Sequence, residues 1–477
     1  MWWDDAVIYQ VYLRSFQDSD GDGIGDLNGV TARLEHIARL GAAAVWLSPV
    51  YPSPNADFGY DVSDYQAIDP GFGTLADFDA LVARAHELGL KVVLDYVPCH
   101  TSIEHPWFRE HPDYYVWADE IPNNWRAAFG GPAWERDPQS GRYYLSSFFP
   151  EQADLNWRNP DVRTAMGEAL RFWVDRGVDG FRVDALDRIM KDPELRDEPP
   201  ASGPPALPLD PQDAELEHIY SRNAPDVGVA LEAIRDAVGP TLLIGEVFLP
   251  TAQLGPYLEH LDVCFSFETL FAGGDAAALA EAIAAGISDG GLGWVLSNHD
   301  FDRLATRAGP GNARALALLL LTLPGPVFIY QGDELGMANS APSAPALDRH
   351  GRDNLRMPMR WDESAHAGFT TGTPWLTTDE AEAPPVSIQE GDRSSTLALV
   401  RGAINVRGEL DGPVAIDSPD DGLVVLVRGR HVTAVNLSGE PRPAPAAARV
   451  VLAARPGDGA DLRIVPAHGG WVALRPD

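Results

Sequence analysis

Eight short apolar runs dominate the hydrophobic pattern of the chain as far as residue 332. Each run is continuous and does not alternate with polar residues, which indicates strands buried on both faces, as in parallel sheets covered by helices. The runs are AVIYQVYL from residue 6, AAVWLSP from 43, KVVLDYV from 91, VDGFRVDA from 178, TLLIGEV from 241, DVCFSFE from 262, WVLSNHD from 294 and GPVFIYQG from 325.

Amphipathic helical patterns separate these runs and carry helix start and stop signals. In one of them Thr74 can cap the N-terminus together with Asp77, and Gly89 can end the helix. Another opens with Asn159 as a cap and Pro160 at the first helical position, where proline is favoured. Strands and helices that alternate in eight repeats predict a (β/α)8 TIM barrel, which is an α/β fold.

Two insertions and one change of pattern interrupt this series. Residues 101–155 are rich in Trp, Tyr, Phe, Pro and Gly with little helical period, so we expect a small excursion domain after the third strand. Residues 190–225 are proline-rich, and we expect an irregular segment. From 393 to 477, short β-runs such as TLALV, GLVVLVRG, HVTAVNLS and RVVLAA predict a C-terminal antiparallel β-sandwich domain. The barrel itself is then expected over 1–100 and 156–392.

Composition narrows the possible partners and location. The formal net charge of -34 repels polyphosphates and anionic lipids, which argues against nucleic acid and membrane surfaces as partners. No apolar run is long enough to span a bilayer, and the N-terminal MWWDDAVIYQ has no signal-peptide pattern. The two cysteines form neither a disulfide framework nor a metal cluster. We therefore expect a cytoplasmic enzyme with a small-molecule substrate, and leave its oligomeric state open.

Polar residues gather at the carboxyl ends of four of the predicted strands. In a TIM barrel these ends form the rim that carries catalytic groups. The residues are Asp95 and His100 after the third run, Arg182 and Asp184 in the fourth, Glu246 in the fifth, and Asn298, His299 and Asp300 in the seventh.

Arg182 and Asp184 are two positions apart, so their side chains share one face of the strand. A guanidinium beside a buried carboxylate lowers its pKa and keeps it ionised, as a nucleophile requires. Glu246 has apolar neighbours and no adjacent cation in the sequence, which raises its pKa and makes it the candidate acid. The alternative is that Arg182 and Asp184 form a purely structural ion pair.

One ionised and one protonated carboxyl group is the arrangement of retaining glycosidases, whose two carboxyl groups lie about 5 to 5.5 Å apart. Neighbouring strands, about 4.8 Å apart, allow this separation between Asp184 and Glu246. Asp300 is then a third acid that supports the charge of the oxocarbenium-like transition state. His100 and His299 are candidate donors to sugar hydroxyls.

The motifs that carry these residues resemble those of the α-amylase family of glycoside hydrolases, and within it the oligo-1,6-glucosidase and α-glucosidase group. The similarity covers nearly the whole chain. The segments are DYVPCH, EQADLNW, GFRVDAL, IGEVF, SNHD and RDNLRMPMRWDESAHAGF.

This resemblance implies a role for individual residues. The family's nucleophile falls on Asp184, its acid/base on Glu246 and its transition-state stabiliser on Asp300. Its substrate-binding positions fall on Tyr60, Asp61, His100, Arg182, His299 and Arg352. Tyr60 would stack on the sugar ring, while Asp61 and Arg352 would bind the hydroxyls of the terminal glucose. Such a closed pocket admits only a chain end, which implies exo action on short substrates.

The chain departs from the family pattern at a few positions. Cys99 replaces the usual Asn, Ala153 the usual Pro, and Met357 and Arg360 the usual Thr and Gln. These changes concern the pocket rim. The residue after the nucleophile is Ala185, where a valine in related enzymes is associated with α-1,6 bonds; the resemblance therefore favours α-1,4 linkages.

The loop DSDGDGIGD, residues 18–26, places acids at alternate positions as in an oxygen-rich calcium site. An EF-hand would have Glu at the twelfth position, where this chain has Gly29. The resemblance implies a structural Ca²⁺ or Mg²⁺, held by the carboxylates of Asp18, Asp20, Asp22 and Asp26 and the carbonyl of Ile24. The alternative is a solvated acidic turn in which Asp26 caps the next helix.

The hypothesis from sequence is a retaining, exo-acting α-glucosidase for short oligosaccharides or disaccharides. A glucosyltransferase, a sucrose or trehalose isomerase, or an oligo-1,6-glucosidase would use the same covalent glucosyl-enzyme. A non-catalytic sugar-binding subunit is the alternative from another class, although such relatives usually lose one of the three acids.

Overall fold

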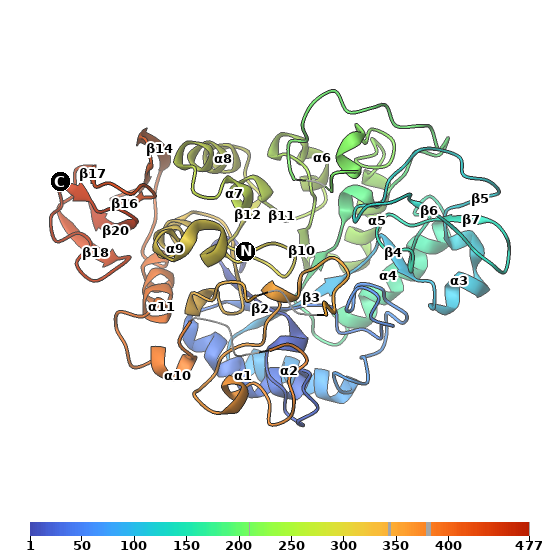
Figure 1. Cartoon of the computed structure of the whole chain (residues 1–477), viewed down its shortest axis with the longest axis horizontal. Coiled ribbons are helices and arrows are strands. Elements are labelled where there is room, and N and C mark those ends of the chain that lie inside the picture. Colours follow the sequence, from blue (N-terminus) through green and yellow to red (C-terminus); the bar gives the residue numbers. More distant parts are fainter. Residues whose placement is uncertain (209, 342–344, 378–382, 477) are drawn as a thin grey trace. The chain divides into compact units, whose positions relative to one another are not determined.

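A computed structural model describes residues 1–208, 210–341, 345–377 and 383–476 of the chain. Within these residues, the parallel strands close into a barrel that follows chain order (Figure 1). Its strands are β1 (Val7–Val11), β2 (Ala44–Leu47), β3 (Lys91–Tyr96), β9 (Gly180–Val183), β10 (Leu242–Gly245), β11 (Val263–Phe265), β12 (Leu292–Val295) and β13 (Val327–Tyr330). Seven of the eight predicted runs contain one of these strands, and the seventh, WVLSNHD, begins two residues after the start of β12. The TIM barrel is confirmed.

The barrel strands are buried along their length because helices follow them. Apart from the half-buried Lys91, every residue of these strands is buried, as the continuous apolar runs predict. The helices between strands are α1 (Leu27–Leu40), α2 (Leu75–Glu87), α4 (Pro160–Val174), α5 (Gly228–Val238), α6 (Gly255–Leu258), α7 (Phe267–Ala272), α8 (Ala276–Asp289) and α9 (Leu304–Thr322).

The predicted helix signals act as expected. The Thr74 hydroxyl donates to Asp77 Oδ2 at 2.6 Å, and the Asp77 amide donates back to Thr74 Oγ1 at 3.3 Å. Asn159 accepts a hydrogen bond from the amide of Asp161 and is followed by Pro160 at the first helical position. These caps satisfy amide groups that the first turn of a helix leaves without intrahelical partners.

Internal contacts divide the chain into two compact units. Unit 1 comprises Met1–Trp46, Ala83–Lys91 and Ser266–Asp477, and unit 2 comprises Leu47–Val82 and Val92–Phe265.

In unit 2, the segment after β3 contains small antiparallel sheets and its own hydrophobic cluster. β4 (His100–Ser102) pairs with β8 (Gln152–Asp154), and β7 (Tyr143–Leu145) lies between β5 (Trp117–Ala118) and β6 (Trp134–Arg136). One short helix, α3 (Pro106–Glu110), precedes β5. The cluster consists of Trp125, Ala133, Trp134 and Leu145.

The second insertion of unit 2 is irregular, as predicted, in its described residues; residue 209 lies outside them. A single 3₁₀ turn at Asp213–Glu215 interrupts it. Two buried ion pairs attach it to the segment after β9: Arg188 Nη2 lies 2.7 Å from Asp213 Oδ2, and Arg222 Nε lies 2.7 Å from Asp187 Oδ2.

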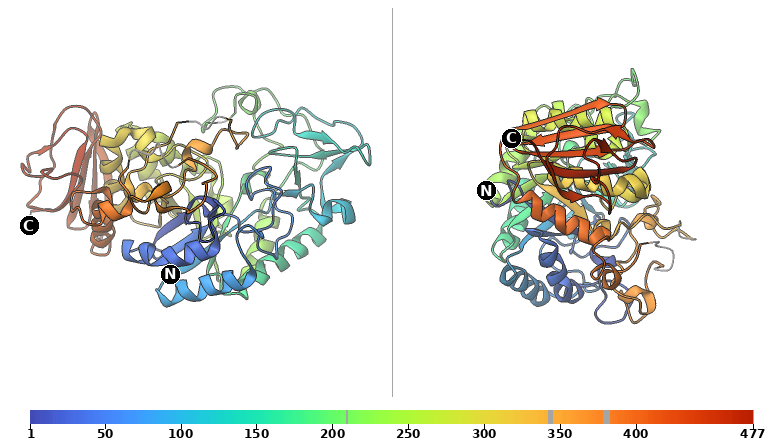
Figure 2. Two further views of the ribbon diagram at one scale, coloured as in Figure 1. Left: turned by 60° about the horizontal axis from the view of Figure 1, so that its bottom comes forward. Right: turned by 90° about the vertical axis from the view of Figure 1, so that its left-hand side faces the viewer.

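The C-terminal part of unit 1 is an antiparallel five-stranded sheet, drawn in dark orange to red in Figure 2. Its order is β14 (Val414–Asp420), β15 (Leu423–Arg428), β16 (His431–Asn436), β20 (Gly469–Leu474) and β18 (Arg449–Ala453), and a small sheet joins β17 (Arg442–Pro443) to β19 (Ile464–Val465). Three of the four predicted β-runs form β15, β16 and β18.

The remaining predicted β-run, TLALV, does not form a strand, so this prediction is wrong. It begins the helix α11 (Thr396–Arg407), which follows the short helix α10 (Val386–Gln389). The side chain of Ser395 accepts the amide of Ala398 and so caps the helix. Leu397, Val400 and Ile404 are buried at helical spacing, a period that a five-residue apolar run is too short to reveal.

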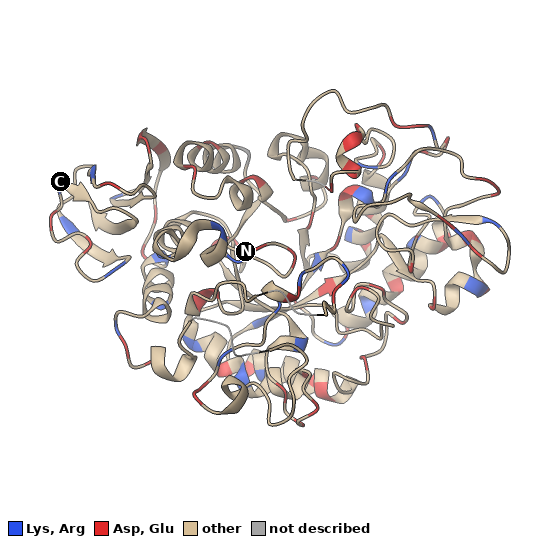
Figure 3. Ribbon diagram, in the orientation of Figure 1, with Lys and Arg blue, Asp and Glu red and all other residues tan. Residues whose placement is uncertain are grey.

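Acidic side chains outnumber basic ones, 70 to 36, and Figure 3 shows them distributed over helices and loops. In the part of the chain that the structure describes, no helix combines the length and apolar character needed to cross a membrane.

Candidate active site

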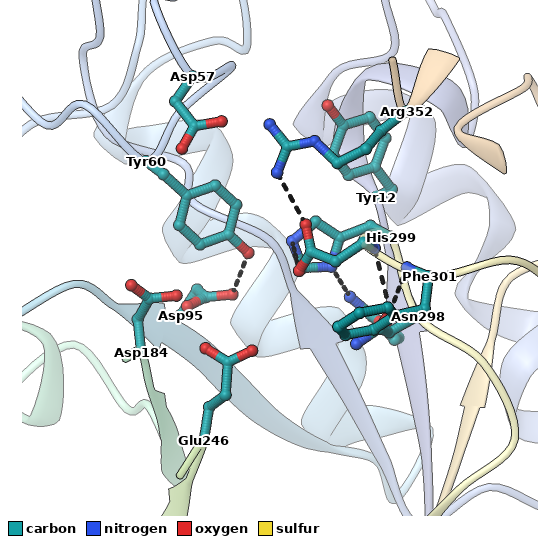
Figure 4. Close-up of polar contacts among 12 residues, drawn as sticks. Tyr12, Asp57, Tyr60, Asp95, Asp184, Glu246, Asn298, His299, Phe301 and Arg352 are labelled. Carbon is teal, nitrogen blue, oxygen red and sulfur yellow. Dashed lines mark hydrogen bonds and ion pairs between the residues drawn. The ribbon is translucent and has the colours of Figure 1, made fainter. Parts of the chain in front are cut away.

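In unit 2, the guanidinium of Arg182 binds three carboxyl groups. Arg182 Nη1 lies 2.8 Å from Asp95 Oδ1 and 2.6 Å from Asp184 Oδ1, and Nη2 lies 2.8 Å from Glu246 Oε2. Strand register explains part of this arrangement, since Asp95 on β3 is the direct neighbour of Arg182 on β9. We call Asp95, Arg182, Asp184 and Glu246 the Arg182 cluster; Figure 4 labels its three acids.

The expectation that Glu246 lacks an adjacent cation is wrong. Its Oε2 accepts from Arg182, and also from the backbone amide of Ala185 at 3.1 Å. Ala185 itself has a φ of 47°, so the chain turns left-handed directly after the amide that binds Glu246. The pairing of β9 with β10 brings together residues that are 64 positions apart, which the sequence around Glu246 could not reveal.

Both candidate catalytic acids therefore share one cation. The Asp184 and Glu246 side chains are only 10% and 15% exposed, so both acids are largely shielded from solvent. Figure 4 shows their carboxyl groups gathered near that of Asp95. Asp184 and Glu246 belong to a single site and not to separate cavities.

Burial controls the protonation of this cluster. Burial raises the pKa of Asp95 to about 6, although Arg182 and the hydroxyl of Tyr60 stabilise its ionised form. Burial disfavours the charged guanidinium of Arg182, but the surrounding carboxylates outweigh it and hold its pKa above the ordinary value. Arg182 stays charged, and three carboxyl groups compete for it.

Tyr60 and His100 lie beside the Arg182 cluster. The hydroxyl of Tyr60 donates to Asp95 Oδ2 at 2.9 Å, and Arg182 lies 5.7 Å from the centre of the Tyr60 ring. His100 Nε2 lies 3.0 Å from the carbonyl oxygen of Tyr60. Burial lowers the pKa of His100, which favours the neutral ring. The resemblance-based position of Tyr60 and His100 thus falls next to the two acids.

Asp61 does not have the role that the sequence suggested. It is fully buried, and its carboxylate accepts the Ser53 hydroxyl at 2.6 Å and the amides of Ala56 and Asp57 at 2.9 and 3.0 Å. All three donors belong to the same loop, so the Asp61 carboxylate stabilises the conformation of that loop. Assigning it to sugar hydroxyls is therefore a mistake.

Asp57, which sequence reasoning missed, lies on the loop that Asp61 organises. Figure 4 shows its carboxyl group beside Tyr60, and Gln152 Nε2 donates to its Oδ2 at 3.1 Å. Asp57 lies three positions before Tyr60 and Asp61 one position after it, so the sequence alone does not show which of the two faces the site. The signal is the loop hydrogen bonding, which only the structure contains.

In unit 1, Asp300 lies on the loop after β12 and is paired with two arginines. Its Oδ1 lies 2.9 Å from Arg352 Nη1 and 3.2 Å from Arg356 Nη2. The side chain of Asn298 accepts the amides of Asp300 and Phe301, both at 3.0 Å, which fixes the turn that presents Asp300. Figure 4 labels Asn298 and Phe301 in this turn.

The same arginines have further partners that fix their orientation. Arg352 forms a two-bond pair with Asp348, Nε to Oδ2 and Nη2 to Oδ1, both 2.9 Å. Burial opposes ionisation of Asp348, but Arg352 holds its pKa at about 2. Arg356 Nε donates to the carbonyl of His299 at 2.8 Å, and His299 Nε2 lies 3.3 Å from Asp300 Oδ2. We call His299, Asp300, Asp348, Arg352 and Arg356 the Asp300 cluster.

The acidic loop of unit 1 brings three carboxylates together. One oxygen each of Asp18, Asp20 and Asp22 lies within 4.8 Å of the others. Burial and the neighbouring acids raise the pKa of Asp22, a repulsion that a bound cation would relieve. The amide of Ile24 donates to Asp22 at 2.7 Å and orders the turn.

Asp26 is not part of that group. Its carboxylate accepts the amide and the hydroxyl of Ser19 at 2.7 and 2.8 Å and the amide of Gly29 at 2.8 Å. It is the N-cap of α1. Asp26 therefore caps α1, as the alternative for this loop expected.

Comparison with known proteins gives consistent matches. The family model "Alpha amylase, catalytic domain" matches residues 10–412. A probable alpha-glucosidase of Rhizobium meliloti is 43% identical over 446 residues, which cover 83% of this chain and 80% of that protein. An oligo-1,6-glucosidase of Parageobacillus thermoglucosidasius is 37% identical over 79% of this chain and 78% of that protein. The crystal structure of an alpha-glucosyl transfer enzyme is 36% identical, with a TM-score of 0.90 and coverage of 100% of this chain and 99% of that one.

Proposed function

The chain belongs to the α-amylase family, and from this premise we propose that it is a retaining, exo-acting α-glucosidase. It removes terminal α-linked glucose from short oligosaccharides or disaccharides. The observation that carries the proposal is the common guanidinium of the Arg182 cluster, which contacts both Asp184 and Glu246. A pair of carboxyl groups on neighbouring strands is what a double displacement at one anomeric carbon requires.

Each acid has a defined step in this proposal. The Asp184 carboxylate bonds to the anomeric carbon while the glycosidic C–O bond breaks, and Glu246 gives its proton to the departing oxygen. Water then attacks the glucosyl-enzyme, Glu246 takes back a proton, and the ester bond to Asp184 breaks. Two inversions at the same carbon release α-glucose.

The charge balance of the Arg182 cluster supports these roles. A single guanidinium cannot neutralise three buried carboxylates, so at least one proton is bound with little cost near neutral pH. Glu246 directly follows β10, and Asp184 directly follows the neighbouring strand β9. The family resemblance gives the acid role to Glu246. Asp184 keeps the shortest of the contacts with Arg182, at 2.6 Å, which favours its ionised form.

We assign Asp300 the stabilising role of the third acid. Its contacts with Arg352 and Arg356 favour the carboxylate form, which can support positive charge on the sugar ring. Tyr60, His100, His299 and Arg352, together with Asp57, are the proposed contacts of the glucose unit.

The proposed linkage preference is α-1,4, from Ala185 after the nucleophile. A second candidate function is glucosyl transfer, in which a sugar hydroxyl replaces water at the glucosyl-enzyme. The alpha-glucosyl transfer enzyme that this chain resembles over its full length supports this candidate.

One experiment tests the reaction and separates the two candidates. The protein is incubated with maltose, isomaltose, sucrose and trehalose, and the products are followed by ¹H NMR from the first minutes. We expect α-glucose as the first product, with maltose consumed fastest. New disaccharides in place of free glucose would establish transfer, and β-glucose as the first product would exclude a retaining mechanism.

We also propose that the loop of Asp18, Asp20, Asp22 and the Ile24 carbonyl holds a structural Ca²⁺ or Mg²⁺. Its oxygen donors suit a hard cation, which would neutralise the repulsion among the three acids. The thermal midpoint should then fall on chelation and recover with Ca²⁺, while an Asp20→Asn variant should lose this response. A midpoint indifferent to both treatments would contradict the site.

The cytoplasm is the proposed location. Cys99 and Cys264 are both buried and free, which suits a reducing compartment.

A further inference from the structure

The imidazole of His299 is held on several sides within unit 1. The side chain is fully buried. Tyr12 stacks on the ring, with centroids 5.8 Å apart and an interplanar angle of 22°, and Trp46 meets it edge-on at 6.4 Å and 84°. Packing of this kind fixes where the ring lies and how it is rotated, but not which nitrogen carries the proton.

Gln10 supplies the missing constraint. It lies on β1, is 1% exposed, and its side-chain Nε2 is 2.9 Å from His299 Nδ1. Its backbone is fixed by the pairing of β1 with β13 and by the amide of Gln331, which donates to the Gln10 carbonyl at 3.0 Å. The Gln10 amide therefore approaches the ring from a rigid strand.

The chemistry of the two groups decides the proton position. An amide nitrogen only donates, so the ring nitrogen opposite it has to accept and carries no proton. In a neutral imidazole, the proton is then on the other nitrogen. That nitrogen, Nε2, lies 3.3 Å from Asp300 Oδ2.

We propose that Gln10 is a positioning residue that holds His299 in the tautomer with its proton on Nε2. His299 thereby acts as a neutral donor directed at Asp300 Oδ2, and at a sugar hydroxyl when substrate is bound. The tautomer follows from the contacts of unit 1 alone, whereas donation to a sugar hydroxyl rests on the proposed α-glucosidase function.

The charged groups around the ring agree with a neutral donor. Arg356 donates to the His299 carbonyl, and Arg352 binds the same carboxylate that faces Nε2. Two nearby guanidinium groups disfavour a further positive charge on the imidazole, and the Asp300 carboxylate that faces the ring is already paired with both of them. A donor at Nε2 keeps its hydrogen bond to an acceptor without adding a charge.

The direct test is NMR of the whole protein labelled with ¹⁵N-histidine. Long-range ¹H–¹⁵N correlations distinguish a protonated from an unprotonated ring nitrogen, and a His299→Gln variant identifies the signals of this residue. We expect Nδ1 to be unprotonated and Nε2 to be protonated at neutral pH. A proton on Nδ1, or equal populations of both tautomers, would overturn the proposal.

Two variants of Gln10 test the consequence for catalysis. In Gln10→Glu a carboxylate accepts a proton from Nδ1, so the tautomer should switch or the ring become doubly protonated, and kcat/KM should fall by about 10- to 100-fold. Gln10→Met keeps a similar volume and leaves Nδ1 without a donor, so both tautomers should be populated, with a smaller loss.

The matched control is Gln66→Glu, the same chemical change at an exposed position, which should leave both the NMR signals and kcat/KM unchanged. If Gln10→Glu has the wild-type tautomer and kcat/KM, the positioning role is wrong. If the wild type shows the expected tautomer but no activity on α-glucosides, only the proposed function fails, because the NMR measurement does not depend on turnover.

Discussion

The Arg182 cluster and the Asp300 cluster both pair arginines with carboxyl groups, but in different proportions. In the first, one guanidinium contacts three carboxyl groups, those of Asp95, Asp184 and Glu246. In the second, the carboxyl groups of Asp300 and Asp348 contact the two guanidiniums of Arg352 and Arg356. Where buried carboxyl groups outnumber the cations, at least one carboxyl group retains a proton. Where cations and carboxyl groups are equal in number, the carboxyl groups are ionised.

The directions of the pKa shifts agree with this contrast. The pKa of Asp95 is raised by burial to about 6, and that of Asp348 is held at about 2 by its pairing with Arg352 despite burial. Proton transfer belongs where a carboxyl group can bind and release a proton, and stabilisation of positive charge belongs where it cannot. The ratio of cations to carboxyl groups, more than the residue types, separates the two roles.

The largest effect should come from removing the proposed nucleophile or the proposed acid/base of the Arg182 cluster. Asp184→Gly and Glu246→Gln should each lower kcat on maltose by about 10⁴-fold or more, because each removes a group that forms or breaks a bond. Asp64→Asn, an exposed change, is the control and should retain full activity.

Azide distinguishes the two roles. In Asp184→Gly it replaces the nucleophile and should form a β-glucosyl azide from an α-glucosyl donor with a good leaving group. In Glu246→Gln it should attack the glucosyl-enzyme from the opposite face and give the α-glucosyl azide. The reverse pattern, read by NMR of the products, would exchange the assignments.

A smaller effect is expected when the shared cation is lost. Arg182→Met removes the partner of three carboxyl groups and leaves them buried without compensation, which should cost about 3–5 kcal/mol of unfolding free energy at pH 7. Urea unfolding measures this cost. Arg142→Met, at an exposed arginine paired with the exposed Asp119, is the control and should change stability little.

The loss in Arg182→Met should also depend on pH. In the wild type Asp95 has a folded-state pKa of about 6, raised from 3.8 in the unfolded chain by burial, so its protonated form stabilises the fold below about pH 4 and this contribution is lost as pH rises through 6. Without Arg182 the carboxyl groups bind protons more tightly. The variant should therefore lose less stability at pH 5 than at pH 7, and an equal loss at both would refute the shared-cation account.

The barrel was predictable because its information is local. Continuous apolar runs between capped amphipathic helices specify buried parallel strands, and pairs such as Thr74 with Asp77 act within one turn. The exception, TLALV, belongs to a helix whose buried face is recognisable only over the full length of α11.

The site was predictable only in part, because only some of its contacts are local in the sequence. The contact between Arg182 and Asp184 follows from their spacing on one strand, since side chains two apart share a face. The contacts of Arg182 with Glu246 and of Gln10 with His299 join residues 64 and 289 positions apart, which strand order alone brings together. Electrostatic arguments based on neighbours in the sequence therefore failed at Glu246.

The smallest expected effect concerns the loop beside the Arg182 cluster, and it tests whether Asp61 organises that loop or binds the sugar. Asp61→Asn weakens a carboxylate that accepts three hydrogen bonds within the loop, and it should cost about 1–3 kcal/mol of stability while changing kcat little. Asp57→Asn is the matched change on the same loop and should instead raise KM at nearly constant thermal midpoint. If Asp61→Asn unfolded at the wild-type midpoint but lost most of its kcat/KM, Asp61 would be a sugar contact. A carboxylate that accepts three hydrogen bonds within its loop would then also bind substrate.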